Sequence, residues 1–451
     1  MRAGEYGASS RLLWELGRRV KLSLMLRKIQ YVCLVASIVF ISADRIDLFF
    51  SHGPFVLTPF LVFAPLGLLL GFIRTGPERM FRFPTPSPVR RQLPFVAATI
   101  VFLLFTFASL PLGMDPGRGL VLFIALLSVA VLAYGISVQI LTDPEQGKLI
   151  SQAITLGLIV YAVFCIGEGI AWSRGISLSD EPVAWSESVF AATPFGAWAP
   201  RLSGPTIDPN RAGFVLTMYL VLLDKFAVRS RYARGLIVFF ILLTVSKSAI
   251  ACWLGYYLFS KRFWVRLASR RAIAWLTVIG IAASVVCFVY GTQIVNLAQA
   301  LELGDAVSDR MSMDRGSSGE SHVLLIERGF DTWLTSPKTI IAGIGFGSAP
   351  KVLADFFGND KYGNFHCLYV TVLAESGLLA FMVLVFILGY PIIGRTGTLS
   401  AIAAIAIFNL SYQSHMEPIF WLVLALLWSS ERRQRTKVRS LVLARATASF
   451  P

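Results

Sequence analysis

Two short stretches of the sequence combine residue types that suit chemistry on phosphate groups. One of them is RLSGPTIDPNRAG, residues 201–213, which carries Arg201 and Arg211 on either side of an Asp-Pro pair. Asp208 is a favoured residue for capping a helix, and Pro209 suits the first helical position. A helix that begins there presents unpaired backbone N–H groups and its positive dipole end. Cations beside such a helix start form an anion site that suits phosphate.

The same residues allow a purely structural interpretation. In it, Asp208 and Pro209 cap an ordinary helix, and the two arginines contact lipid head groups at a membrane surface. Lys247, in the stretch LTVSKSAI (residues 243–250), is a third candidate cation, but it also suits a simple turn. Spacing alone leaves both interpretations open.

The second stretch is GNFHCLYVTVLAESGLLAF, residues 363–381, which places one of four histidines before an apolar run. A histidine with an ordinary pKa of about 6.5 exchanges a proton near neutral pH and can act as a general base. On one continuous helix, His366 and Gly377 would lie about 20° apart around the axis. Gly377 would then let another helix approach that shared face closely. The alternative is an interfacial histidine that hydrogen-bonds a loop carbonyl.

Other polar residues are weaker candidates. Glu168 and Glu375 fall inside apolar segments, where a carboxylate is costly and commonly functional, although Glu375 could simply hydrogen-bond a neighbouring helix. The stretch GIGFGS, residues 343–348, lacks the lysine of a phosphate-binding loop, so we interpret it as a flexible turn. The acidic residues of the region 291–364 are scattered, and we predict no metal site and no cofactor.

The elements that must position these residues are membrane-spanning helices. Of the 451 residues, 55% are hydrophobic and 15% are charged, against about 45–50% and about 25% in soluble domains. The apolar residues form runs of roughly 18–25, long enough to cross the ~30 Å hydrocarbon core of a bilayer. The net charge of +15 comes from basic residues in short loops between the runs. That pattern sets membrane orientation and does not indicate a nucleic-acid surface.

Charge placement predicts twelve spans, with both chain ends in the cytoplasm. The predicted domains are a basic N-terminal segment, a transmembrane domain and a basic C-terminal tail, at residues 1–28, 29–429 and 430–451. Residues 235–260 are a predicted hairpin that turns at VSKSA, because a single helix there would put two basic loops on opposite sides. The spans lie near residues 29–43, 54–73, 94–112, 118–141, 149–172, 210–226, 235–260 (two), 272–290, 366–393, 398–411 and 418–429.

The expected fold is an all-α polytopic membrane protein of about twelve transmembrane helices. Polar stretches 173–208 and 291–364 are long loops on the outer side, where the candidate site residues also fall. Segment 319–333 has an apolar face at helical spacing, which suits a helix lying on the outer membrane–water interface. That face consists of Val323, Ile326, Phe330 and Trp333.

Three stretches together resemble the superfamily of bacterial O-antigen ligases and O-antigen or exopolysaccharide polymerases. RLSGPTIDPNRAG is similar to the family's arginine-bearing stretch before a span. LTVSKSAI is similar to its Ser-Arg hairpin, with Lys247 in place of the arginine. FHCLYVTVLAESGLLA is similar to its histidine motif, in which His366 and Gly377 match and Cys367 replaces a polar residue. The likeness covers roughly residues 190–420, with the motifs in the family's order.

The resemblance implies an inverting, metal-independent glycosyl transfer from undecaprenyl-diphosphate-linked oligosaccharide at the periplasmic face of the bacterial inner membrane. Arg201 and Arg211, with Lys247, would bind the diphosphate. His366 would be the base that activates the acceptor hydroxyl, or a further phosphate ligand. The supporting residues would be Asp208, Gly377 and Glu375.

The acceptor distinguishes two activities within that family. A polymerase transfers the glycan to another lipid-linked repeat unit, and a ligase transfers it to lipid A-core. Two long outer loops favour the polymerase, because two glycan chains must be held. A transporter or flippase is a further alternative, but the sequence contains neither the internal repeats nor the paired broken helices typical of transporters. Expected partners are the lipid-linked donor, its glycan acceptor, membrane lipid and proteins of chain-length control or export, with no nucleic acid.

Overall fold

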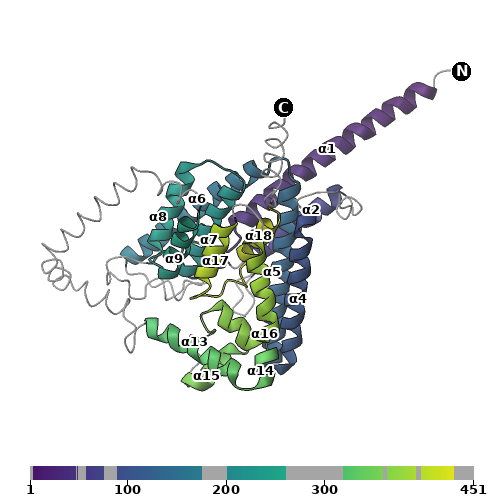
Figure 1. Ribbon diagram of the computed structural model, residues 1–451. Coiled ribbons are helices and arrows are strands. Elements are labelled where there is room, and N and C mark those ends of the chain that lie inside the picture. The colour runs from purple at the N-terminus through teal and green to yellow at the C-terminus, as the bar shows by residue number, and fades with distance from the viewer. Residues whose placement is uncertain are drawn as a thin grey trace, which may run out of the picture.

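The described part of the chain is helical throughout. In the computed structural model, helices connected by turns and loops make up these residues, which contain no strand (Figure 1). The all-α class is therefore confirmed for the part of the chain that the structure describes. That part comprises residues 4–46, 48, 57–75, 89–174, 201–260, 318–358, 363–392 and 398–430.

The helices follow the predicted spans closely. Each predicted span within the described residues coincides with a helix, whereas the span near 272–290 lies outside them. The N-terminal half contains α1 (Gly4–Val39), α2 (Pro59–Thr75), α4 (Leu93–Ser109), α5 (Pro116–Thr142), α6 (Gln146–Ser173), α7 (Pro209–Lys225), α8 (Arg231–Leu243) and α9 (Lys247–Leu258). The C-terminal half contains α13 (Ser318–Leu334), α14 (Pro337–Ala342), α15 (Ala349–Phe357), α16 (Leu368–Gly389), α17 (Leu399–Phe408) and α18 (Pro418–Trp428).

Two of the predicted boundaries can be compared with these helices. The hairpin at VSKSA is confirmed, because α8 ends at Leu243 and α9 begins at Lys247. The first helix runs without a break across the predicted boundary at residue 28, and it ends at Val39. The C-terminal tail and most of the stretch 173–208 lie outside the described residues.

Five helical segments are long and apolar enough to cross a membrane. Their outward-facing side chains are apolar as well: Leu104, Val131 and Val163 are 60%, 56% and 62% exposed. Such a belt suits lipid, because large exposed apolar patches are rare on soluble monomers. The five segments are Lys21–Val39, Arg90–Leu112, Pro116–Thr142, Gln146–Ser173 and Leu368–Ile392.

Helices α7 and α18 lie in the interior of the bundle (Figure 1). Every residue from Ala212 to Leu223 of α7 is buried, and so is every residue of α18 from Ile419 to Trp428. A helix that is apolar on all sides requires such a place among other helices. The start of α7 therefore lies within the bundle and not at its margin.

Ion pairs connect helix termini that lie at one end of the bundle. Arg45, which follows α1, pairs with Glu168 near the end of α6. Arg211, at the start of α7, pairs with Glu417, which precedes α18. We call this the polar end of the bundle. The opposite, basic end carries the helix termini with Arg74, Arg90, Arg91, Lys148, Lys225, Arg229, Arg231 and Arg234.

Helices α13, α14 and α15 form a layer beside α16 (Figure 1). The predicted helix over 319–333 is confirmed as α13. Its Ile326 and Trp333 pack on a second, smaller core, whereas Val323 and Phe330 are 44% and 40% exposed. Gly329 lies against Phe365 and Val370, which places α13 directly over the chain around His366.

The prediction that His366 and Gly377 share one face of a continuous helix is wrong. Helix α16 begins at Leu368, after His366, and His366 itself has φ 52°. The helix is interrupted at Gly377, where φ is 79° and ψ is 178°. A Cβ at Gly377 would overlap the backbone carbonyl of Ile341, so this close crossing requires glycine. Helical periodicity therefore does not extend from His366 to Gly377.

The stretch GIGFGS, interpreted from the sequence as a flexible turn, forms a turn between α14 and α15 whose backbone is hydrogen-bonded to α16. Its three glycines have φ values of 74°, 98° and 84°, and the stretch is hydrogen-bonded to α16. The N–H groups of Ile344 and Gly345 donate to the carbonyls of Ala374 and Glu375, at 2.8 and 3.0 Å. The break at Gly377 frees these carbonyls from the helix, and a buried carbonyl needs a donor.

Candidate functional site

The helix start predicted at Asp208 and Pro209 is confirmed. Helix α7 begins at Pro209, and the Asp208 carboxylate accepts the backbone N–H of Asn210 at 2.6 Å. Arg201 is half-buried beside this start. Its Nη2 donates to Asn210 Oδ1 at 3.5 Å, and its Nε donates to the Thr244 carbonyl at 3.4 Å. Arg201 thus connects the start of α7 with the turn between α8 and α9.

A second helix start lies against the first. Helix α9 begins at the exposed Lys247, and Ser246 caps it by accepting the N–H of Ala249 at 3.1 Å. The Ser246 hydroxyl donates to Asn210 Oδ1 at 2.5 Å, which links the two starts directly. Two helix N-termini, Arg201 and Lys247 therefore converge, and each adds positive potential at the same place.

The convergence has a local cause in Gly213. This residue lies in the second turn of α7, so close to Ala249 in α9 that a Cβ on Gly213 would overlap the Ala249 methyl group. Small residues at a crossing let two helix backbones approach closely. Because the crossing is one turn from both helix starts, it also brings those starts together.

Arg211 takes part in a different set of contacts. Its guanidinium pairs with the Asp44 carboxylate and with Glu417 Oε1, the latter at 2.5 Å. Glu417 is buried; burial raises the pKa of its carboxyl, and the Arg211 guanidinium opposes that shift. Two carboxylates compensate the charge of Arg211 within the protein. Phosphate binding by Arg211 stays a prediction. The two carboxylates compete with a phosphate group for its guanidinium, a competition that the sequence did not reveal.

His366 lies in the turn that leads into α16. Its backbone N–H donates to Asn364 Oδ1 at 2.7 Å, and its φ of 52° is in the left-handed region, which is uncommon for residues other than glycine. Phe365 and Cys367 on either side are buried, whereas His366 is partly exposed. Conformations of this kind cluster at functional sites, where the surroundings hold them in place.

One loop, residues 409–417, connects the two predicted stretches. The N–H of Leu368 donates to the carbonyls of Asn409 and Tyr412, at 3.1 and 3.0 Å. The hydroxyls of Ser248 and Ser411 are 2.7 Å apart. The chain around His366 and the start of α9 therefore lie on the same loop, and the structure brings the predicted site stretches together there.

Glu375 and Gly377 belong to a different neighbourhood. Glu375 is buried, and its Oε1 accepts the N–H of Ala349 at 2.8 Å, at the start of α15. Gly377 contacts the end of α14. Both residues hold the layer of α14 and α15 against α16, so any support that they give to the site is indirect.

Sequence reasoning missed several residues of the polar end. Asn210 and Ser246 link the two helix starts, while Asp44, Arg45 and Glu417 form ion pairs with residues distant in sequence. One signal was present: charged residues at the end of an apolar run are costly unless they are paired or functional. The partners themselves could not be read from the sequence.

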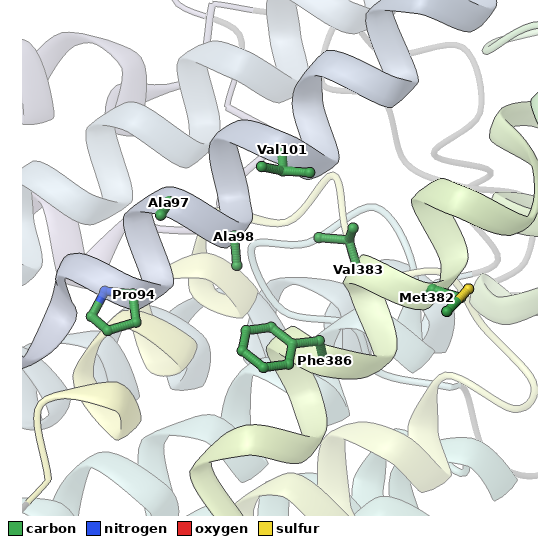
Figure 2. Close-up of a pocket in the computed structure, with 7 residues that line it drawn as sticks. All are labelled: Pro94, Ala97, Ala98, Val101, Met382, Val383 and Phe386. Carbon is green, nitrogen blue, oxygen red and sulfur yellow. The ribbon is translucent and has the colours of Figure 1, made fainter.

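An apolar groove lies between α4 and α16, apart from these residues (Figure 2). Its volume is about 470 Å³, and its side chains offer no polar group for chemistry. Figure 2 shows the side chains of the two helices on either side of the groove. The lining residues are Pro94, Ala97, Ala98, Val101, Met382, Val383 and Phe386.

The chain matches no protein-family model, and no curated protein is similar to it in sequence. Two helix starts and two cations suit an anionic group, and His366 lies in a turn beside loop 409–417.

Proposed function

We propose that this protein is a membrane glycosyltransferase that takes a glycan from undecaprenyl diphosphate on the periplasmic side of the bacterial inner membrane. The observation that carries the proposal is the convergence of the α7 and α9 starts with Arg201 and Lys247, on the loop that also holds the chain around His366.

The reaction is a displacement at the anomeric carbon of the donor glycan. The acceptor oxygen forms a bond to that carbon, and the bond from the carbon to the diphosphate oxygen breaks. The departing electron pair leaves on the diphosphate, which Arg201, Lys247 and the two helix starts stabilise. The acceptor proton passes to His366, which acts as the general base. The attack inverts the anomeric centre, and the chain's own side chains supply the charge.

The orientation follows from the distribution of charge. Basic loops face the cytoplasm in membrane proteins, so the basic end of the bundle is cytoplasmic and the polar end is periplasmic. Twelve spans result when the segment near 272–290 is counted with the described helices. Exposed Val323 and Phe330 of α13 then lie on the outer leaflet, where an amphipathic helix is stable.

The acceptor in this proposal is another lipid-linked repeat unit. Stretches 173–208 and 291–364 provide two outer regions, and polymerisation requires that two glycan chains be held. Transfer to lipid A-core is the alternative within the same chemistry. Proteins of chain-length control or export are the expected protein partners.

A transport function has one feature in its favour, the break in α16 at Gly377. In transporters, the carbonyls that such a break frees commonly bind an ion or substrate. Here the carbonyls of Ala374 and Glu375 accept hydrogen bonds from the GIGFGS stretch instead. The break is therefore accounted for by packing.

A deletion strain tests the proposal. Loss of long surface polysaccharide with retention of single-unit glycan indicates a polymerase, whereas lipid-linked polymer that accumulates unattached indicates a ligase. The purified protein should then convert lipid-diphosphate glycan and release undecaprenyl diphosphate. Unchanged surface polysaccharide in the deletion strain, together with no transfer by the purified protein, would refute it.

A further inference from the structure

Arg45 and Glu168 form an ion pair in the interior of the polar end. Arg45 Nη1 lies 2.5 Å from Glu168 Oε1, and both side chains are 0% exposed. Removing two charges from water costs several kcal/mol per ion, and an apolar pair of similar volume is often equally stable or more stable. Stability alone is therefore a poor explanation for this pair.

The pair is hydrogen-bonded to one turn of the chain, residues 203–205. The Glu168 carboxylate accepts the N–H of Ser203 at 3.1 and 3.2 Å and the N–H of Gly204 at 3.0 Å. Arg45 donates to the Gly204 carbonyl at 3.0 Å and to the Ser203 hydroxyl oxygen at 2.7 Å. The backbone N–H of Arg45 donates to the Pro205 carbonyl at 3.2 Å. Most of the hydrogen-bonding capacity of the pair is thus directed at this turn.

The turn lies between Arg201 and the start of α7, so it determines where Arg201 is placed. The bonds from Arg201 to Thr244 and Asn210, at 3.4 and 3.5 Å, are longer than the usual 2.7–3.2 Å. The bonds that hold the turn two residues further on are short and buried. The turn therefore fixes the course of the backbone that leads from Arg201 to the start of α7.

We infer that Arg45 and Glu168 are positioning residues that place Arg201 against the departing diphosphate, an inference that rests on the proposed glycosyl transfer. Neither residue touches the substrate. Displacing a charge-stabilising group by about 1 Å can lower a rate by about 10²-fold. The buried pair supplies the rigidity that prevents such a displacement.

The test uses the full-length protein in lipid nanodiscs and two variants of the pair. Glu168→Gln leaves Arg45 buried without a compensating charge, so it can fail to fold. The double variant Arg45→Met/Glu168→Leu removes both charges together and leaves no lone buried charge. The turn still loses its hydrogen-bond partners, so the melting temperature should fall, but by less than in Glu168→Gln, and the protein should stay folded. Its transfer rate should fall by about 10–100-fold, with kcat reduced more than the KM for the donor lipid.

Hydrogen exchange provides a readout that does not depend on activity. The amides of Ser203 and Gly204 should exchange at least about tenfold faster in the double variant, because they lose their acceptors. Glu145→Gln is the matched control, since Glu145 lies at the other end of α6 in an exposed pair with Lys148. It should leave transfer, melting and exchange at Ser203 unchanged.

The outcomes separate this inference from the proposed function. Wild-type transfer by a folded double variant with faster exchange would overturn the positioning role and leave the proposed function intact. Unchanged exchange at Ser203 and Gly204 would also overturn it. The proposed function fails if the Arg201→Ala variant transfers glycan as well as the wild type does. It also fails if the wild-type protein shows no transfer. In either case the positioning role fails with it.

Discussion

Arg201 and Arg211 belong to one short motif, yet their guanidinium groups have different surroundings. Arg211 lies between the carboxylates of Asp44 and Glu417, which compensate its charge. Arg201 donates to the neutral oxygens of Thr244 and Asn210, beside two helix starts. At the scale of single residues, the position beside two helix starts makes Arg201 the better candidate for binding phosphate.

This difference leads to a prediction for each arginine. Arg201→Lys keeps the charge but loses the planar fork that binds two phosphate oxygens, so transfer should fall by about 10²-fold while expression and melting stay near normal. Arg211→Ala should lower stability by about 3–5 kcal/mol, because it leaves buried Glu417 without its partner. Transfer assays and thermal unfolding of the purified variants measure both effects. Transfer activity within about twofold of the wild type in Arg201→Ala would contradict the assignment of Arg201 to phosphate binding.

His366 can be tested by separating its two possible roles. A general base typically contributes about 10²–10⁴-fold, and His366→Ala should lose roughly that much turnover. His366→Gln keeps a hydrogen bond but takes up no proton near neutral pH, so it should be about as inactive as the alanine variant. The wild-type rate should fall towards acid pH, because a protonated histidine cannot take up the proton of the acceptor hydroxyl.

The pH profile of transfer between about pH 5 and 8, with donor-lipid binding as the control, decides between the roles. A rate that instead falls as pH rises would make His366 a cationic phosphate ligand. Wild-type turnover in both His366 variants would return it to a structural role in the interfacial turn.

His415 gives a prediction about stability. It is buried with its ring against Phe346, and burial lowers its pKa to about 4. In the unfolded chain a histidine has a pKa of about 6.5, so between pH 6.5 and 4 only the unfolded state binds the proton. Stability should therefore decline as pH falls through this window, by up to about 3 kcal/mol from this residue.

Thermal unfolding in detergent at pH 7 and pH 5 measures that contribution. His415→Leu removes the titrating group, so its melting temperature should fall less on acidification than that of the wild type. An equal fall in both proteins would show that His415 contributes nothing to the pH dependence.

At the scale of elements, the crossing of α7 and α9 decides whether two helix starts form one site. Gly213 permits that crossing, because it has no side chain to meet Ala249. Each helix is capped by its own residue, Asp208 or Ser246, so each start forms from local sequence. Their convergence depends on the packing between them.

A reciprocal exchange at this crossing tests the point. Gly213→Ala should separate the helix starts and lower transfer by at least about tenfold, since small displacements of charge-stabilising groups are costly. Adding Ala249→Gly removes the overlapping methyl group and should restore much of the activity. Gly235→Ala in α8 is the matched control, because a Cβ there meets nothing within 4 Å. Full activity in Gly213→Ala alone would contradict this account.

At the scale of the whole molecule, the difference in charge between the polar and basic ends of the bundle predicts its orientation in the membrane. The basic end carries the eight arginines and lysines named above, from Arg74 to Arg234, and the polar end carries the candidate site with Arg201, Arg211 and Lys247. Basic loops remain in the cytoplasm, so the site should face the periplasm.

Cysteine labelling in intact cells tests this orientation. An impermeant thiol reagent should miss Tyr232→Cys at the basic end and Ser269→Cys, which lies outside the described residues, until the inner membrane is permeabilised. It should label Lys338→Cys in α14 at once. Labelling of Tyr232→Cys in intact cells would reverse the orientation and place the site in the cytoplasm.

The sequence by itself determined the helical class, the helix starts and the hairpin at Val245–Ala249. These features depend on local physics, namely the length of apolar runs, capping side chains and loop charge. The cap at Asp208 is where the Asp-Pro pair indicated it, and α8 and α9 are separated close to the predicted turn at VSKSA. Residue types also pointed to Arg201 and His366 as site candidates.

Only the tertiary structure decided which of these residues share a neighbourhood. Glu168 is the partner of Arg45 across 123 positions, and no local pattern links two residues so far apart. Gly377 leaves the helical conformation because the backbone of Ile341 crosses it, so the periodicity that placed His366 on the same face did not apply. Local interactions determine where helices form and how they are capped. Contacts between distant segments determine which charges pair and which helices cross to form the site.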